Sequence, residues 1–326
     1  MQIIRLSTQH YLNNFSIADS VNNHDIFNDF KNHGLCLSIG NFDGIHLGHQ
    51  SIISELKETS KKYNLPCAIM TFEPHPLAYF NQNKKTDFRI TTLKQKIKIL
   101  EKHKIDYLIL QNFNKNFSEL SADFFIKNIL EKTLNVKYLT IGYDFTFGKN
   151  RQGNFKDLEL AKFNLCEINP IKINIANQEY TCSSSLVRSL LKSGNIDQAN
   201  KILGHNFTIE NTVIQGQKLA TNLGFPTANQ ICKPQQIQPK FGVYKSLVSL
   251  KNSNDKLLAI TNFGLKPTFN NNLSNPLFET HILNFKKDLY NQKISVELIE
   301  FIRNEIKFSS IEELKNQINL DITNLK

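Results

Sequence analysis

The pattern of secondary structure changes near Gly204, and this change constrains the fold more than any other feature. Before it, short apolar runs alternate with helical patterns, and after it strand patterns follow one another until about Ser310. The alternation predicts a parallel sheet with helices on both faces, because parallel strands need long crossovers. The succession of strands predicts an antiparallel barrel or sandwich with one C-terminal helix. We therefore expect two domains in the 326 residues, the first of class α/β.

The expected elements locate the boundary between these domains. In the first part the expected strands are 35–39, 67–72, 107–110 and 136–141, and the expected helices are 47–62, 91–103 and 122–134. Two short helices, 183–192 and 196–203, are separated by Gly194-Asn195. The later strands are 207–214, 243–250, 257–263, 278–285 and 294–302. We expect a first domain of residues 1–193, a linker of 194–205 and a second domain of 206–326.

The composition is that of an ordinary globular protein. Hydrophobic residues make up 40% and charged residues 21% of the chain. No apolar run reaches the roughly 18 residues of a membrane-spanning helix, and the first residues lack a signal-peptide pattern, so we expect a cytoplasmic protein. The net charge of +10 is scattered along the chain, and we expect no nucleic acid, membrane or obligate protein partner. The five cysteines form no C-x-x-C pair, which favours packing thiols over zinc or disulfides.

The strongest local motif lies where the first expected strand gives way to a helix. Residues 40–49 read GNFDGIHLGH. The carboxyl end of a parallel strand is where open α/β sheets bind ligands, and a helix N-terminus offers free N–H groups to phosphate. His46 and His49 are three residues apart and share a helix face, and Gly48 between them lets a nucleotide approach the backbone.

This arrangement suits adenylyl transfer. A phosphate nucleophile is already ionised, so catalysis needs positioning and charge stabilisation rather than a base. Two imidazoles can donate hydrogen bonds to phosphate oxygens, and Mg²⁺ would neutralise the pyrophosphate. The alternative is that His46 and His49 are structural histidines at a helix start. A second anion cradle is formed by the serines 183–185 with Arg188, for which the alternative is a simple N-cap serine.

The second part of the chain holds a weaker pair of signals. In residues 224–229, GFPTAN, Thr227 and Asn229 offer hard oxygen ligands suited to Mg²⁺. The alternative is that this segment is only a turn between two strands. Glu279 and His281 should share one strand face, with Phe278, Thr280 and Ile282 on the other. A carboxylate on a barrel's inner face could take a proton from an alcohol, whereas an exposed strand Glu is the alternative.

The motifs together resemble the prokaryotic bifunctional riboflavin kinase/FAD synthetase family from about Leu35 to the C-terminus. The adenylyltransferase half is matched by residues 40–49, 71–76 (TFEPHP), 141–148 (IGYDFTFG) with Arg151 and Gly153, and 183–188. The kinase half is matched by residues 224–229, 241–244, 262–269, 279–285, 289–290 and 301–308. The ordered occurrence of motifs from both halves is highly specific.

The resemblance implies a Rossmann-like nucleotidyltransferase domain and a six-stranded antiparallel β-barrel. It implies that the first converts FMN to FAD and that the second phosphorylates riboflavin to FMN. The implied catalytic residues are His46, His49 and Glu279, the last as base on the ribityl 5′-hydroxyl. The implied ATP residues of the adenylyltransferase are Gly40, Asn41, Phe42, Asp43, Gly44, Gly48, Ser183, Ser184, Ser185 and Arg188. Its implied flavin residues are Asp144, Phe145, Phe147 and Arg151.

For the kinase, the resemblance implies a substrate site and a metal site. Gly216, Lys218, Gly224, Asn262 and Arg303 are expected at ATP and flavin, and Thr227 and Asn229 at Mg²⁺. The expected cofactor is Mg²⁺ with ATP as co-substrate, with no permanently bound prosthetic group, and the expected partners are riboflavin, FMN and ATP.

The chain departs from the family pattern at three places. Ala220-Thr221 stands where the family usually has Gly-Arg, which makes a phosphate flap less flexible and less basic. Asn291 stands where Gly is usual, and Asn tolerates positive φ, so the turn should survive. Ser185 replaces a Thr and keeps its hydroxyl.

Two other functions compete with this reading. One is another His-x-Gly-His nucleotidyltransferase, acting on pantetheine phosphate, nicotinamide mononucleotide or a tRNA-linked substrate, and the barrel motifs argue against it. The other is a non-catalytic flavin- or RNA-binding regulator derived from an enzyme. The presence of His46, His49, Arg188 and Glu279 argues against that function.

Overall fold

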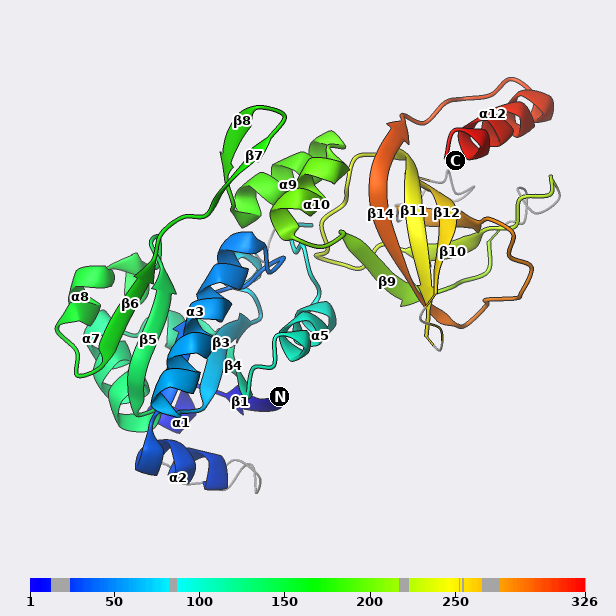
Figure 1. The fold of residues 1–326 in the computed structure, drawn as a ribbon. Helices are drawn as coiled ribbons and strands as arrows, with labels where there is room; N and C mark the ends of the chain where they lie inside the picture. The colour runs from blue at the N-terminus through cyan, green and yellow to red at the C-terminus, as the bar shows by residue number, and fades with distance from the viewer. Residues whose placement is uncertain are drawn as a thin grey trace. The chain divides into compact units, whose positions relative to one another are not determined.

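The computed structural model describes residues 1–12, 24–81, 87–216, 223–251, 253, 255–265 and 276–325 (Figure 1). The chain forms two compact units. The first unit comprises Met1–Thr86 and Thr92–Cys182, and the second comprises Asp87–Thr91 and Ser183–Lys326. Each unit has its own six-stranded sheet.

The first unit alternates strands and helices as expected. Its strands are β1 (Gln2–Leu6), β2 (Leu35–Ile39), β3 (Cys67–Glu73), β4 (Tyr107–Asn112), β5 (Val136–Gly142), β6 (Asn164–Ile168), β7 (Lys172–Ile175) and β8 (Gln178–Thr181). Its helices are α1 (Gln9–Leu12), α2 (His24–His33), α3 (Leu47–Tyr63), α4 (Pro76–Phe80), α5 (Leu93–Lys102), α6 (Lys115–Ser118), α7 (Ala122–Phe124), the π-helix η1 (Phe125–Thr133), the 3₁₀-helix η2 (Lys149–Arg151) and α8 (Phe155–Glu159).

The parallel sheet of the first unit reverses its strand order beside β2. The order is β1-β4-β3-β2-β5-β6, and every neighbouring pair is parallel. The chain passes outward from β2 through β3 to β4 and then crosses to β5 on the other side of β2. The carboxyl ends of the paired strands β2 and β5 therefore form the topological switch point, outside which such sheets bind ligands.

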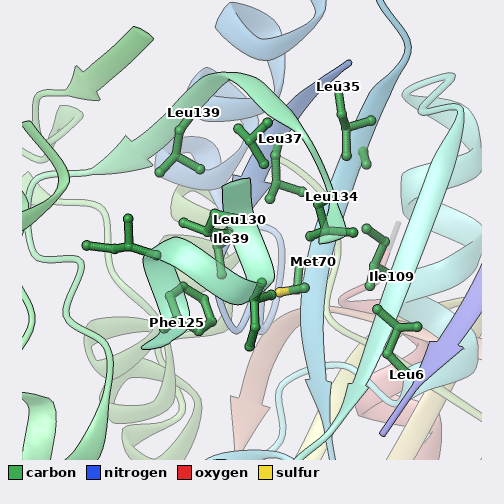
Figure 2. Packing of buried hydrophobic residues seen from close by; sticks show 14 of the residues in the cluster. Leu6, Leu35, Leu37, Ile39, Met70, Ile109, Phe125, Leu130, Leu134 and Leu139 are labelled. Atoms are coloured by element: carbon green, nitrogen blue, oxygen red, sulfur yellow. The ribbon is translucent and has the colours of Figure 1, made fainter. Parts of the chain in front are cut away.

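Both faces of this sheet are covered, because successive strand residues point to opposite sides. On one face, Leu37 and Ile39 of β2 pack with Met70, with Leu130 of η1 and with Leu134, which directly follows η1 (Figure 2). On the other face, Cys36 packs with Ile53 and Leu56 of α3 and with Leu100 of α5. Burial of these apolar side chains holds the carboxyl ends of β2 and β5 in place.

The second unit is an antiparallel barrel preceded by two helices. Its helices are α9 (Ser184–Ser193), α10 (Ile196–Leu203) and α12 (Ile311–Thr323), and its strands are β9 (Thr208–Thr212), β10 (Ala228–Ile231), β11 (Gly242–Leu250), β12 (Lys256–Gly264), β13 (Leu277–Ile282) and β14 (Lys293–Arg303). The order β10-β13-β12-β11-β14-β9 is antiparallel throughout. The Ile214 N–H donates to Asn229 O at 2.8 Å and closes the barrel between the β9 and β10 ends.

A short segment from within the first part of the sequence belongs to the second unit. The Phe88 N–H donates to Gln235 O at 3.0 Å, and the Ile237 N–H donates to Arg89 O at 2.8 Å. Helices α9 and α10 also lie in this unit, so the compact division falls at Ser183. The domain limits expected from the sequence, 1–193 and 206–326, remain a prediction of which residues carry out each function.

The expected fold class is confirmed in both halves, and the differences from the expected elements have local causes. The helix expected at 122–134 is α7 followed by the π-helix η1, a hydrogen-bond pattern that apolar periodicity does not reveal. The strand expected at 278–285 ends at Ile282, before Asn284, whose φ is 56°. The hairpin of β7 and β8 was not expected, and it turns at Ala176-Asn177, both at positive φ. No helix in the described residues is long and apolar enough to cross a membrane.

Candidate functional site

The loop between β2 and α3 lies at the switch point of the first unit. It contains Phe42 and Ile45, with φ of 45° and 44°, and Gly44, with φ of 82°. Positive φ is unfavourable for Phe and Ile, and such residues persist only where their surroundings fix them. Both side chains are fully buried, at 1% and 0% exposure, against the core that α3 covers. The apolar side chains thus anchor an unusual loop backbone.

The two motif histidines meet at the start of α3. Their rings stack with centroids 3.8 Å apart and an interplanar angle of 28°. His46 is the N-cap residue of α3, but its side chain makes no cap hydrogen bond, and the first turn contains no acidic residue. The helix N-terminus is therefore suited to an anion, with two imidazoles beside it.

Gly48 permits this stacking. A Cβ atom on Gly48 would lie 3.1 Å from both Cε1 and Nδ1 of His46 and 3.4 Å from the carbonyl oxygen of Cys182. The backbone at Gly48 has no positive φ, so the requirement is for space rather than for conformation. The expected approach of a nucleotide to Gly48 remains a prediction, and the nearest side chain to this position in the structure is that of His46.

A buried lysine beneath the loop is a feature that the sequence reading missed. Lys96 of α5 is 3% exposed, and its ammonium donates to Asn41 O at 2.6 Å and to Thr71 Oγ1 at 3.2 Å. The signal was present, because Lys96 lies three residues after Leu93 and four before Leu100 on the expected apolar face of the helix. A charged residue on such a face is rarely fully buried unless polar groups pair with it.

The expected flavin residues follow β5, the other strand at the switch point. The rings of Phe145 and Phe147 stack with centroids 5.6 Å apart, and Phe147 is buried against Phe125. Arg151 donates from Nε to Thr146 Oγ1 at 2.8 Å, and Asp144 is exposed. The loops after β2 and β5 thus lie on adjacent strands, because the register pairs Ser38 with Thr140.

The serine-rich motif begins α9 in the second unit. Ser183 is the N-cap, and its hydroxyl accepts from the Leu186 N–H at 3.2 Å. Arg188 donates from Nε to Phe88 O at 2.8 Å, and its guanidinium lies 5.8 Å from the Phe88 ring centroid. The capping role considered as the alternative is thus present for Ser183, and the phosphate role of Ser183, Ser184, Ser185 and Arg188 remains a prediction.

Three expected kinase residues form a row across the barrel. The register pairs Asn229 of β10 with Glu279 of β13, and Glu279 with Asn262 of β12. Directly paired residues point to the same face of a sheet. An amide, a carboxylate and a second amide are therefore side by side.

This row lies on the outer face of the barrel, which corrects the expectation of an inner-face carboxylate. The interior is occupied by the neighbouring residues, since Thr261 and Thr280 are fully buried and their hydroxyls are 3.1 Å apart. Phe278 stacks on Phe263 in the same interior. Strand alternation then places Glu279 outside, partly exposed, together with His281 as expected.

Two glycine-containing segments pack against this row. A methyl group on Gly216 would overlap the side-chain amide of Asn229, so a larger residue there would displace that amide. After Gly224, which has φ of 91°, Pro226 O accepts from Nδ1 of His281 at 2.9 Å, and the ring of Phe225 meets His281 edge-on. The contact of His281 with this loop was not predicted from the sequence. Thr227 directly precedes β10 and is partly exposed.

Arg303 lies in the same register row but is engaged elsewhere. It pairs with Val243, the residue that also pairs with Asn262. Its guanidinium donates from Nη2 to Asp321 Oδ2 at 2.7 Å and from Nε to both carboxylate oxygens at 3.0 Å. This pair fixes α12 to β14, and the expected role of Arg303 at the substrate remains a prediction.

Some expected site residues lie outside the described residues. They are Lys218, the Ala220-Thr221 departure and residues 266–269 of the kinase segment 262–269. The Asn291 departure is described, and its φ of 61° confirms that Asn keeps the turn in the conformation that Gly usually takes.

The cysteines are poor candidates for chemistry. Burial raises the pKa of Cys36 and of Cys232 to about 12 and the pKa of Cys67 to about 11. A thiol with such a pKa is neutral near pH 7 and a weak nucleophile. Four of the five are buried, in agreement with a packing role.

Comparisons with known proteins agree with this division of sites. A family model described as FAD synthetase matches residues 29–185, and one described as riboflavin kinase matches residues 203–326. The chain is 41% identical over 299 residues to a bifunctional riboflavin kinase/FMN adenylyltransferase of Buchnera aphidicola, covering 90% of this chain and 94% of that protein. A protein of the same name from Haemophilus influenzae is 40% identical over 293 residues, with the same coverage.

A solved structure supports the fold over the whole length. A protein from Streptococcus pneumoniae, titled a macrolide-efflux protein, matches with a TM-score of 0.81 at 24% identity and covers 98% of both chains. At that identity the match bears on the fold alone. The two family models and the relatives at 40% and 41% identity carry the assignment: the chain belongs to the family of bifunctional riboflavin kinase/FMN adenylyltransferases.

Proposed function

We propose that this chain phosphorylates riboflavin to FMN on the outer face of its barrel and adenylylates FMN to FAD at the switch point of its parallel sheet. The observation that carries the proposal is the presence of two distinct clusters, one in each compact unit. The first is the His46–His49 stack at the start of α3, and the second is the row Asn229–Glu279–Asn262. Each cluster has the chemistry that one of the two reactions needs.

In the adenylyl transfer, an FMN phosphate oxygen attacks the α-phosphorus of ATP and pyrophosphate leaves. The attacking phosphate is already ionised, so the site needs to hold and neutralise charge. His46 and His49 donate hydrogen bonds to phosphate oxygens, and the N-terminal end of α3 attracts the same anion. The loop after β5, with Phe145 and Phe147, holds the flavin on the adjacent strand. The assignment of Ser183, Ser184, Ser185 and Arg188 to the ATP phosphates rests on the family motif.

In the kinase reaction, Glu279 accepts the proton of the ribityl 5′-hydroxyl as its oxygen attacks the γ-phosphorus of ATP and ADP leaves. The carboxylate is partly exposed and can meet a substrate alcohol. Asn262 and Asn229 flank it and can orient polar groups of the substrates.

A magnesium ion fits the donors beside Glu279. The Oδ1 atom of Asn229 is buried and accepts no hydrogen bond from any described residue. Such an oxygen is a suitable hard ligand, and Thr227, two residues earlier, offers a hydroxyl. Within the described ranges no three His, Cys, Asp or Glu side chains gather as a metal site, so the phosphates of ATP would complete the coordination. When bound, Mg²⁺ supplies charge neutralisation for the transferring phosphoryl group.

The test is a product analysis. The purified protein is incubated with riboflavin, ATP and Mg²⁺, and the flavins are separated by chromatography. The proposal predicts FMN first and FAD later, with neither formed when EDTA removes the metal. FMN without FAD would remove the adenylyltransferase assignment, and the absence of both products would overturn the proposal.

A further inference from the structure

Lys96 connects helix α5 to the loop that begins the adenylyltransferase site. The side chain is 3% exposed, and its ammonium donates to the carbonyl oxygen of Asn41 at 2.6 Å. The same ammonium donates to Thr71 Oγ1 at 3.2 Å, and that hydroxyl donates to Asn41 O at 3.1 Å. Three groups from α5, β3 and the loop thus form a closed triangle of hydrogen bonds around one carbonyl.

The position of this carbonyl matters because the next residues carry the unusual backbone. Phe42 follows Asn41 directly with φ of 45°, and Ile45 has φ of 44°. L-residues rarely adopt this conformation, so the loop holds its shape only if several contacts fix it. Burial of Phe42 and Ile45 fixes the side chains, and the triangle fixes the backbone where the loop leaves β2.

The ammonium also places a positive charge against the loop that leads to α3. Burying a lysine removes it from water at a considerable cost, which hydrogen bonds to fixed acceptors partly offset. A charge in a low-dielectric interior acts more strongly on nearby anions than one at the surface. The start of α3, which receives ATP phosphates under the proposed function, follows the same loop.

We propose that Lys96 is a positioning residue for FMN adenylylation: through the Asn41 carbonyl it holds loop 40–46 in the conformation that accepts ATP before ATP arrives. This inference rests on the proposed adenylyltransferase function. It assigns to Lys96 no contact with the reacting atoms. Lys96 contributes to ATP affinity and to turnover in FMN adenylylation, and it contributes nothing to riboflavin phosphorylation.

The main experiment compares Lys96→Met with the matched control Lys98→Met. Both substitutions remove one positive charge from α5, but Lys98 is exposed. Loss of a charge-assisted hydrogen bond predicts a fall of about 10- to 100-fold in kcat/KM for FMN adenylylation in Lys96→Met, with a higher KM for ATP. Riboflavin phosphorylation by the same variant, and both activities of Lys98→Met, should stay within about twofold of wild type. A purely structural loss would lower the active fraction and leave KM unchanged, which would overturn the proposal.

A second variant guards against misfolding of Lys96→Met. Thr71→Val nearly preserves shape and removes the hydroxyl that donates to the same carbonyl. It should also raise the KM for ATP, and its effect should combine with that of Lys96→Met less than additively, because both act on one acceptor. Full additivity, or an unchanged KM in Thr71→Val, would refute the shared role.

Nucleotide binding separates this inference from the proposed function. Calorimetry with α,β-methylene-ATP, which cannot donate an adenylyl group, should show two binding events in wild type. In Lys96→Met both events should remain, and one of them should have a lower affinity. If wild type forms no FAD while this weakening is seen, the reaction assignment fails and the role of Lys96 stands. If wild type forms FAD and Lys96→Met binds and turns over like wild type, the role of Lys96 fails alone.

Discussion

Replacement of Gly48 by Ala should separate the stability of the first unit from its activity. The new methyl carbon would lie 3.1 Å from Cε1 and Nδ1 of His46, about 0.3 Å closer than the 3.4 Å at which ordinary contact begins. The His46 ring must therefore shift by a few tenths of an ångström, which disturbs its stack on His49. Because a misplacement of about 1 Å can cost about 10²-fold in rate, a shift of 0.3 Å predicts a loss of about 4-fold in FMN adenylylation.

The same change should not weaken the fold. Gly48 is the second residue of α3 and has no positive φ, so Ala can adopt its backbone. Ala favours a helix over Gly by up to about 1 kcal/mol, which offsets the crowding of the ring. The assay is the initial rate of FAD formation from FMN, beside the thermal unfolding of the same preparation. An unchanged rate would refute the claim that the histidine stack is catalytically aligned. A loss of rate together with a large loss of stability would refute the claim that Gly48 serves spacing alone.

Three further predictions concern other parts of the chain. Glu279→Gln should lower riboflavin phosphorylation by about 10²–10⁴-fold in steady-state assays, as loss of a general base does, and near wild-type turnover would remove Glu279 from that role. Asp321→Asn should lower the free energy of unfolding of the second unit by about 3–5 kcal/mol in denaturant titrations, because the partly buried charge of Arg303 would then face a neutral partner. A change below about 0.5 kcal/mol would contradict the role of this ion pair. The folded-state pKa values of Cys36 and Cys67, about 12 and about 11, exceed the ordinary 9.0, so the folded form keeps protons that the unfolded form loses. The contribution of these thiols to the free energy of unfolding should therefore be complete below about pH 9 and decline toward pH 12. Denaturant midpoints of unfolding measured at pH 8 and pH 10.5 should show a lower value at the higher pH. Equal midpoints at the two pH values would contradict the prediction.

Periodicity predicted the two layers of this protein because both layers depend on local patterns. The strand at 35–39 and the helix from 47 are set by a continuous apolar run and by one apolar helix face, and each lies within a residue of its expected bounds. Strand alternation likewise predicted that Glu279 and His281 share a face. The same alternation puts the apolar Phe278 and Ile282 on the opposite face, and these are the buried side chains, so the expectation of an inner-face carboxylate conflicted with the pattern of the strand itself.

What the sequence could not supply are relations between distant residues. The row Asn229–Glu279–Asn262 depends on the register of three strands, which no local pattern encodes. The triangle of Lys96, Thr71 and Asn41 joins residues up to 55 positions apart. The pairing of Arg303 with Asp321 depends on the docking of α12. In each case the residue types were visible, whereas their partners were decided by tertiary packing.

The central claim is that one chain carries two independent sites, and His49→Ala tests it most directly. Removing one phosphate donor should lower FAD formation from FMN by about 10²–10³-fold. The measurement is the simultaneous chromatography of FMN and FAD formed from riboflavin, ATP and Mg²⁺ by folded wild-type and variant protein. We predict that the variant accumulates FMN at the wild-type rate and forms almost no FAD. A loss of both products in folded protein, or wild-type formation of FAD, would contradict the account.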